Sequence, residues 1–261
     1  MTILEGGATV LDGVKRSRAA LGQPLAETAI VETSADTRLL RIEWPDGRML
    51  NLGPATRVML FPQGFAPRGK PGPAAYVLQG WVKYGSAQGS SAPGLATDRF
   101  LLAPFQGTVV VQVSLPESWI FAQEGTVPLI ETRSLTRHEL SAGGFYARSD
   151  LGPGAAMRSA PSNQLKSVPR AFRDTLPLRY PQVTAQPAAI EMLPSPSYAD
   201  LQAWLTAAPP VTTGFASRFR PLLRDRAFRK ELSAHLVDHP EWRPILYPPP
   251  PPPALPSTPG R

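Results

Sequence analysis

The stretch RIEWPDGRMLNLGPATRVML, residues 41–60, decides the fold that we predict for this chain. Apolar side chains recur at every second position on both sides of Pro45-Asp46-Gly47. A period of two sends alternate side chains to opposite faces of a strand. An Asp-Gly pair between two such runs is a strong hairpin signal, because Gly tolerates the positive φ that the turn requires. We therefore predict an antiparallel hairpin formed by residues 38–45 and 48–53.

The same alternation assigns a face of the hairpin to each side chain. Trp44 should lie on the buried face, as a core aromatic rather than a platform for a ligand. Arg41 and Glu43 should lie on the other face, in water. Gly47 should be the residue with positive φ.

Eight further segments have the short length and the flanking Gly, Pro, Ser or Asp residues that are typical of strands. They are residues 8–15, 28–33, 56–61, 75–84, 100–103, 107–114, 117–123 and 126–132. TVVVQVSL (108–115) is the most apolar and most β-branched run, which favours a central strand. Gly13, Gly80 and Gly125 each stand between apolar strand residues, where a Gly often marks a bulge or a bend. Together these segments predict an antiparallel sandwich or roll over residues 1–135.

The second half of the chain has a different pattern. Residues 136–196 are rich in Pro, Ser, Ala and Gly, which predicts a linker over the surface with a short helix near 168–175. Residues 197–247 predict three short helices, because Ser197 and Asp225 can cap segments whose apolar residues recur at helical spacing. The predicted fold is thus mainly β, followed by a small α-helical C-terminal subdomain. The tail, residues 248–261, begins with six prolines and predicts an extended, disordered polyproline segment.

Proline content and net charge both divide the chain near its middle. Residues 1–150 hold 11 of the 32 prolines and a net charge of +1, whereas residues 151–261 hold 21 prolines and a net charge of +6. We therefore expect two regions with different roles. Cysteine is absent, which excludes disulfide bonds, thiolate nucleophiles and cysteine-ligated zinc.

The order of several motifs resembles a FecR-like domain over residues 5–132. The matching pieces are Gly22-Gln23-Pro24-Leu25, Val31-Glu32-Thr33, Asp46-Gly47, the segment from Leu50 to Val58, and residues 95–131. The resemblance implies an all-β domain outside the bacterial cytoplasm. Its best-known members relay an iron-siderophore signal from the outer membrane to a sigma factor. This chain departs from those members, because the sequence shows neither a membrane-spanning segment nor a recognisable anti-sigma segment.

The C-terminal segment RFRPLLRDRAFRKELSAHLVDHPEWRPILYP resembles a module found in uncharacterised proteobacterial envelope proteins. Together with the FecR-like resemblance, it implies a periplasmic location. No signal-peptide pattern is visible at the start of the chain, so we expect the true start to lie upstream.

One cluster of charge marks a candidate binding surface. Residues 218–230 hold six basic side chains and one Asp, interleaved with Phe219 and Phe228. We interpret the phenylalanines as core residues and the basic side chains as a surface for an anionic partner. The candidates are Arg218, Arg220, Arg224, Arg226, Arg229 and Lys230. The partner would be an acidic protein, another component of the cell envelope or an anionic membrane surface.

The sequence offers little that indicates chemistry. His235 and His239 have the i, i+4 spacing of a two-histidine metal site, but Leu236 stands where a zinc protease has its Glu. His239 precedes Pro240 at a predicted helix end, which favours a capping role. The acids Glu43, Glu117, Glu124 and Glu131 are interpreted as solvated residues of strand faces, with a hydrolase pair as the alternative. We therefore predict neither a catalytic residue nor a metal or other cofactor.

Three hypotheses for the function follow. The leading one is a non-enzymatic envelope protein whose FecR-like β scaffold carries a basic helical module for binding or assembly. The second is a cytoplasmic protein that binds nucleic acid through residues 218–230, consistent with a pI of about 10.0 but without a recognised binding motif. The third is a hydrolase with two carboxylates brought together in space.

Overall fold

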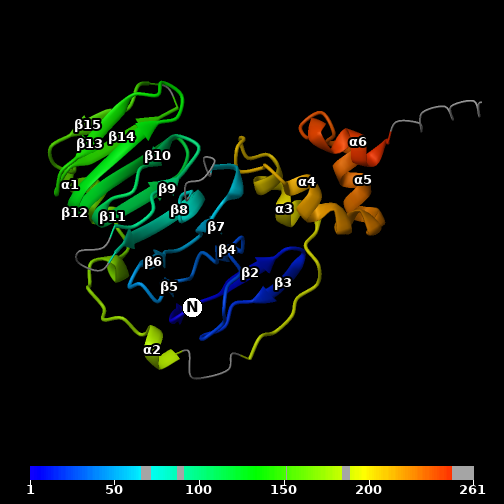
Figure 1. The fold of residues 1–261 in the computed structure, drawn as a ribbon, viewed down its shortest axis with the longest axis horizontal. Helices are drawn as coiled ribbons and strands as arrows, with labels where there is room; N and C mark the ends of the chain where they lie inside the picture. The colour runs from blue at the N-terminus through cyan, green and yellow to red at the C-terminus, as the bar shows by residue number, and fades with distance from the viewer. Residues whose placement is uncertain (66–71, 87–90, 151, 184–188, 249–261) are drawn as a thin grey trace, which may run out of the picture.

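The computed structural model describes residues 1–65, 72–86, 91–150, 152–183 and 189–248 (Figure 1). Strands account for 36% and helices for 21% of the described residues, which confirms a mainly β fold with small C-terminal helices. The strands are β1 (Ile3–Glu5), β2 (Ala8–Asp12), β3 (Lys15–Arg18), β4 (Ile30–Thr33), β5 (Leu39–Glu43), β6 (Met49–Leu52), β7 (Arg57–Leu60), β8 (Ala75–Gly85), β9 (Leu95–Ala96), β10 (Phe100–Leu102), β11 (Gln106–Val113), β12 (Glu117–Glu131), β13 (Arg137–Leu140), β14 (Phe145–Ser149) and β15 (Ala155–Met157). The α-helices are α1 (Ser162–Ser167), α2 (Tyr180–Val183), α3 (Tyr198–Leu205), α4 (Phe215–Phe219), α5 (Arg226–Ala234) and α6 (Arg243–Leu246). The 3-10 helices are η1 (Gln63–Phe65), η2 (Arg170–Phe172), η3 (Arg220–Arg224) and η4 (Pro240–Trp242).

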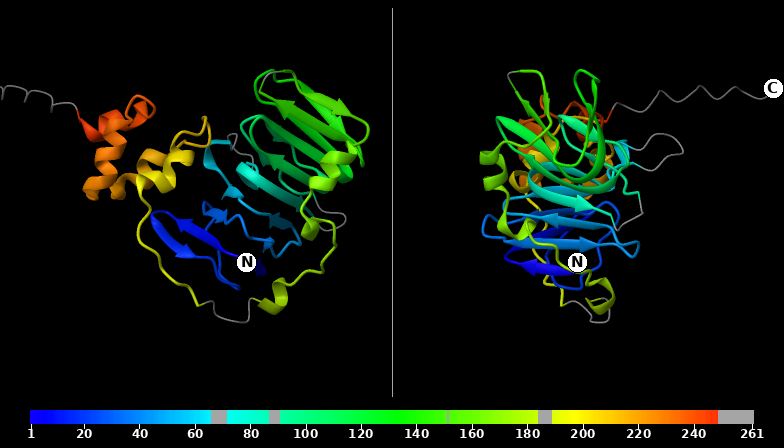
Figure 2. Two further views of the ribbon diagram at one scale, coloured as in Figure 1. Left: turned by 180° about the vertical axis from the view of Figure 1, so that it is seen from behind. Right: turned by 90° about the vertical axis from the view of Figure 1, so that its left-hand side faces the viewer.

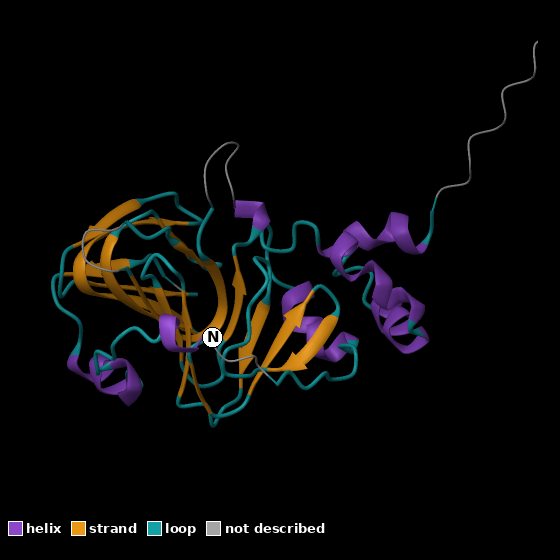
Figure 3. Cartoon of the chain, turned by 60° about the horizontal axis from the view of Figure 1, so that its bottom comes forward, coloured by secondary structure: helices purple, strands orange, loops and turns teal. Residues whose placement is uncertain are grey.

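The described strands form one hydrogen-bonded network that is folded into two layers (Figures 2 and 3). Layer A contains β1, β5, β6, β11, β14, β15 and the adjoining parts of β8 and β12. Layer B contains β2, β3, β4, β7, β9, β10, β13 and the other parts of β8 and β12. All pairs are antiparallel except β8 with β9. As the sequence predicts, β11 is an inner strand, paired with β8 on one side and β12 on the other.

Two glycines mark the points where the long strands pass from one layer to the other. Gly80 in β8 has φ +97, and a Cβ there would lie 2.4 Å from the Thr56 Cα. Gly125 in β12 has φ +79, and a Cβ there would lie within van der Waals overlap of the Gln106 carbonyl oxygen. Both sites need a residue without a side chain, for space and for backbone conformation. The bend predicted at Gly80 and Gly125 is therefore present, whereas Gly13 lies in the β2–β3 turn.

The predicted hairpin is confirmed as β5 and β6, paired from Leu40 with Leu52 to Glu43 with Met49. Gly47 has φ +83, as expected for the turn. Trp44 is half-buried and packs against the edge of the central core. Arg41 and Glu43 lie on the face opposite the core, as predicted, but the expectation that they lie in water is wrong, because both are buried on the outer face of layer A.

Strands also continue beyond residue 135, into the segment expected to be a linker. β13 pairs with β12 in layer B, whereas β14 pairs with β12 and β15 pairs with β14 in layer A. These strands are short, and the Gly143-Gly144 turn separates the first two. The alternation of apolar residues was therefore too brief to predict them. The short helix expected near 168–175 is present as η2, and α1 precedes it outside the predicted range. The predicted tail, from residue 249 onward, lies outside the described residues.

The buried apolar residues form three clusters, and two of them attach the later part of the chain to the sandwich. The first fills the space between the two layers. The second joins the outer face of layer B to α3–α6, which we call the helical module (residues 197–247). The third joins the outer face of layer A to Val168 and Phe172 in residues 160–183, which we call the strap. The sandwich therefore has its own chain packed against both outer faces.

Candidate functional site

The helical module is positioned by side chains that the sequence pattern identified. Ser197 and Asp200 form a capping box at the start of α3, and Asp225 accepts a hydrogen bond from the Ala227 N–H at the start of α5. Phe219 and Phe228 are buried, which confirms them as core residues. Trp204 is also fully buried, and its indole N–H donates to Glu32 on β4 at 2.7 Å. The module is thus fixed to layer B by apolar packing and by a polar contact.

Arg218 belongs to this attachment rather than to a free surface. Its guanidinium donates to the carbonyl oxygens of Leu11, Gly13 and Thr28, at 3.1, 3.4 and 2.7 Å. Burial lowers the Arg218 pKa to about 10, with Asp12 partly offsetting this effect. The side chain also lies over the Phe219 ring, 5.2 Å from its centroid. Of the six candidate residues, Arg218 is therefore the one that holds the module on the β domain.

The other five candidates are exposed, and their side chains make neither an ion pair nor a hydrogen bond with any residue that the structure describes. They are Arg220, Arg224, Arg226, Arg229 and Lys230. On α5 the basic residues at 226, 229 and 230 follow i, i+3 and i+4 spacing and share a helix face. Phe228 and Leu232 project from the opposite side into the apolar cluster. We call these five residues the basic face. They belong to η3 and α5, whose opposite sides are buried in the apolar cluster.

The two C-terminal histidines surround one tyrosine. The His239 Nε2 and the Tyr198 hydroxyl are 2.9 Å apart, and His239 is fully buried. His235 stacks on the Tyr198 ring at a centroid distance of 5.1 Å. Among the described residues, no group of three or more potential ligands could hold a metal ion. The histidines therefore serve to pack α3 against the end of α5.

The four acids considered for a hydrolase pair have separate partners. Glu117 accepts a hydrogen bond from Gln164, Glu124 accepts one from Thr108, and Glu131 pairs with Arg148 at 2.5 Å. Glu43 accepts hydrogen bonds from the backbone N–H groups of Arg179 and Tyr180, at 2.8 and 2.6 Å. Each carboxylate thus has a structural partner of its own in a different part of the sandwich.

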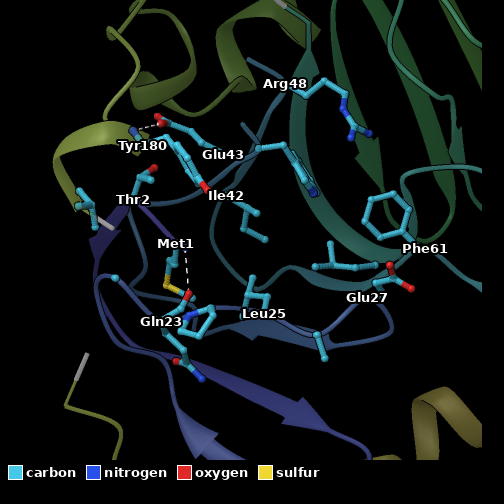
Figure 4. A pocket seen from close by; sticks show the side chains of 16 residues that line it. Met1, Thr2, Gln23, Leu25, Glu27, Ile42, Glu43, Arg48, Phe61 and Tyr180 are labelled. Atoms are coloured by element: carbon cyan, nitrogen blue, oxygen red, sulfur yellow. Dashed lines mark hydrogen bonds between the residues drawn. The ribbon is translucent and has the colours of Figure 1, made fainter. Parts of the chain in front are cut away.

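A cavity of about 700 Å³, which no sequence pattern indicated, lies at the turn end of the β5–β6 hairpin (Figure 4). Its walls come from the N-terminal residues Met1 and Thr2, the loop 22–27, the hairpin, the end of β7 and the strap. Figure 4 shows Arg48 and Phe61 on one side of the cavity, with Glu43 and Tyr180 on another. Because these segments are far apart in the sequence, no local motif could have revealed the cavity.

Aromatic rings and one cation form the most distinctive wall of this cavity. Trp44 and Phe61 meet edge to face, with centroids 6.0 Å apart. The Arg48 guanidinium lies 5.2 Å from the Trp44 centroid and 6.0 Å from the Phe61 centroid. Its Nε donates to Asp46, whereas its buried Nη1 has no hydrogen-bond partner of good geometry in the described part of the chain. Burial raises the pKa of the neighbouring Tyr84 to about 12, with Arg48 acting in the opposite direction.

The solved structures described below resemble this chain at low sequence identity. No protein-family model matches this chain, and no curated protein matches it. One similar solved structure is a "putative anti-sigma factor" from Parabacteroides distasonis ATCC 8503, with 12% identity, a TM-score of 0.40, and coverage of 50% of this chain and 59% of that chain. A second structure with the same description and organism has 12% identity, a TM-score of 0.37, and coverage of 46% and 56%. The chain thus spans less than two thirds of either protein, and likenesses of this size assign no function to it.

Proposed function

We propose that the protein is a non-enzymatic scaffold of the bacterial cell envelope that binds an anionic membrane surface through its basic face. The observation that carries this proposal is the exposure of Arg220, Arg224, Arg226, Arg229 and Lys230 without an acidic partner in the described structure. Each Lys or Arg side chain near an anionic membrane surface contributes roughly 1 kcal/mol to the free energy of binding. The buried side of α5 is already used for packing, so these side chains are available for a partner.

The mounting of the module supports the same proposal. Arg218 and the apolar cluster beneath α4 and α5 fix the module on layer B. A rigid support reduces the conformational entropy that is lost when the basic side chains engage a surface. None of the helices in the described part of the chain is long and apolar enough to span a bilayer. A periplasmic location and the resemblance to a FecR-like domain remain predictions from the sequence motifs.

Binding measurements across salt concentrations test the proposal against nucleic-acid binding. Full-length protein is sedimented with phosphatidylglycerol vesicles, with phosphatidylcholine vesicles and, separately, assayed with duplex DNA. We expect retention on the anionic vesicles at low salt, a steep loss of binding as salt increases, and no retention on the neutral vesicles. Tighter binding to DNA, with a steep salt slope, would favour the second hypothesis instead. Absence of binding to anionic vesicles at low salt would overturn the proposal.

The envelope location needs its own experiment. Cells that express the native gene are fractionated, and the N-terminus of the mature protein is sequenced. Recovery from the periplasmic or membrane fraction is the expected result. Recovery in the cytosol alone would contradict the envelope part of the proposal.

A further inference from the structure

The cavity at the β5–β6 hairpin presents a hydrogen-bond donor beside aromatic surfaces. The Trp44 indole N–H makes no hydrogen bond with a described residue. The Arg48 Nη1 is buried beside Tyr84, so Arg48 contributes its charge and its stacked guanidinium plane to the wall. The buried acceptor on the opposite wall, Glu43, is already engaged by Arg41 and by two backbone N–H groups. Leu25 and Phe61 supply apolar surface between these groups. The exposed Glu27 also lines the cavity, and its carboxylate makes no hydrogen bond with a described residue. The complementary ligand is one with a carbonyl acceptor and an apolar surface.

Proline-rich peptide has this chemistry. Proline carries no backbone N–H, so a polyproline II segment offers carbonyl oxygens and apolar rings and is already extended before it binds. Such segments commonly dock on surfaces lined by aromatic side chains. The chain itself contains a segment of this kind, PPPPPPALPSTPGR (248–261), with six consecutive prolines followed by two P-x-x-P repeats.

We propose that the cavity binds the proline-rich segment 248–261 of a second copy of this chain. Figure 1 shows α6, near which the described chain ends, at one end of the long axis, whereas β5 and β6 lie away from that end. The sequence continues for 13 residues after Pro248. A polyproline II segment of that length spans about 40 Å, at roughly 3.1 Å per residue. That length suffices to connect two copies. The cavity and the basic face lie on different elements, so this proposal and the proposed function can fail independently.

A labelled peptide tests the proposal directly. Protein truncated after Pro248 is titrated into a fluorescein-labelled peptide of residues 248–261, and the fluorescence anisotropy is followed. We expect saturable binding. A peptide with every proline replaced by alanine should bind at least tenfold more weakly, because it is neither extended in advance nor free of N–H donors.

Two substitutions in the cavity and one control substitution on α5 test whether the cavity is the binding site. Ala26→Trp places a large side chain in the cavity and should weaken binding at least tenfold, whereas Ala227→Trp, on the exposed side of α5, should leave it unchanged. Trp44→Phe keeps an aromatic ring and removes the indole N–H, so it should weaken binding about fivefold. Circular dichroism and thermal unfolding confirm that each variant is folded. Absence of saturable binding, or equal binding by the Ala26→Trp and Ala227→Trp variants, would overturn the proposal.

The source of the segment is tested by oligomeric state. Sedimentation equilibrium of the full-length chain should show a mass that rises with protein concentration, and the truncated chain should remain monomeric. If the full-length chain stays monomeric at all concentrations and fails to bind added peptide, while the truncated chain binds it, the tail occupies its own cavity. That result would overturn the assignment to a second copy.

Discussion

Arg41 and Glu43 form an ion pair beneath the strap, with side-chain exposures of only 3% and 0% and a nitrogen–oxygen distance of 3.5 Å. Arg41 also donates to Asn51 and to the carbonyl oxygens of Leu176 and Pro177. Burial lowers the Arg41 pKa, although Glu43 partly offsets this effect. The β5–β6 hairpin is therefore also the anchor of the strap.

Replacing Glu43 should destabilise the fold and loosen the strap. Glu43→Gln leaves the Arg41 charge buried without its counter-ion and should lower the free energy of unfolding by about 3 kcal/mol. Hydrogen exchange at the Arg179 and Tyr180 amides should become faster, because these groups donate to the carboxylate. Glu5→Gln, at an exposed position on β1, should change the stability by less than about 0.5 kcal/mol. Unchanged exchange at both strap amides would show that Glu43 does not hold the strap.

The layer-crossing point in β8 should not tolerate a side chain. Gly80→Ala adds a Cβ 2.4 Å from the Thr56 Cα at a positive φ, and should cost about 3 kcal/mol or more. Gly143→Ala is the matched control, since Gly143 has φ +84 but nothing within 4 Å of its Cβ position, and should cost about 1 kcal/mol. Chemical denaturation of both variants gives the comparison. Equal losses would mean that backbone conformation alone matters at Gly80.

The attachment of the helical module should depend on Arg218 and not on its neighbour Arg220. Arg218→Met removes three hydrogen bonds to β-domain carbonyl groups and should lower the free energy of unfolding by about 2–3 kcal/mol. Arg220→Met, at an exposed position, should change it by less than about 0.5 kcal/mol. Urea denaturation followed by tryptophan fluorescence measures both. The interpretation of Arg218 as an anchor fails if the two variants are equally stable.

The cap of α3 should contribute to the acid sensitivity of the protein. Burial tends to raise the Asp200 pKa, but hydrogen bonds from Ser197 and the interaction with Arg16 outweigh it and keep the pKa below its ordinary value. A folded-state pKa below the unfolded value, about 3.9, means that the stabilisation is present above pH 4 and is lost as the pH falls through the folded pKa. The difference in urea midpoint between wild type and Asp200→Asn should therefore be largest near pH 7 and shrink below pH 4. A difference that stays constant over this range would contradict the argument.

Local sequence patterns predicted the parts of the fold that depend on neighbouring residues. The Asp-Gly turn, the inner strand β11, the caps at Ser197 and Asp225, and the bends at Gly80 and Gly125 all follow from conformational preferences over a few positions. The burial of Arg41 could not be predicted in this way, because the strap that covers it lies more than 130 residues away. Arg218 was grouped with the exposed cations for the same reason, since its carbonyl partners belong to the first 28 residues. The cavity is formed by five separate segments of the chain, so no local sequence pattern could predict it either.

The most direct test of the central claim is the location of the membrane-binding charges. Arg226→Glu, Arg229→Glu and Lys230→Glu are combined in one variant, and Arg133→Glu, Arg137→Glu and Lys166→Glu, all at exposed positions elsewhere, in a second with the same net charge. Co-sedimentation with phosphatidylglycerol vesicles at low salt is then compared among the two variants and the wild type. We predict that the first variant loses nearly all binding and that the second keeps most of it, because attraction falls off within a Debye length of the surface. Equal loss in both variants would show that net charge alone governs the binding, and would contradict a basic face on the helical module.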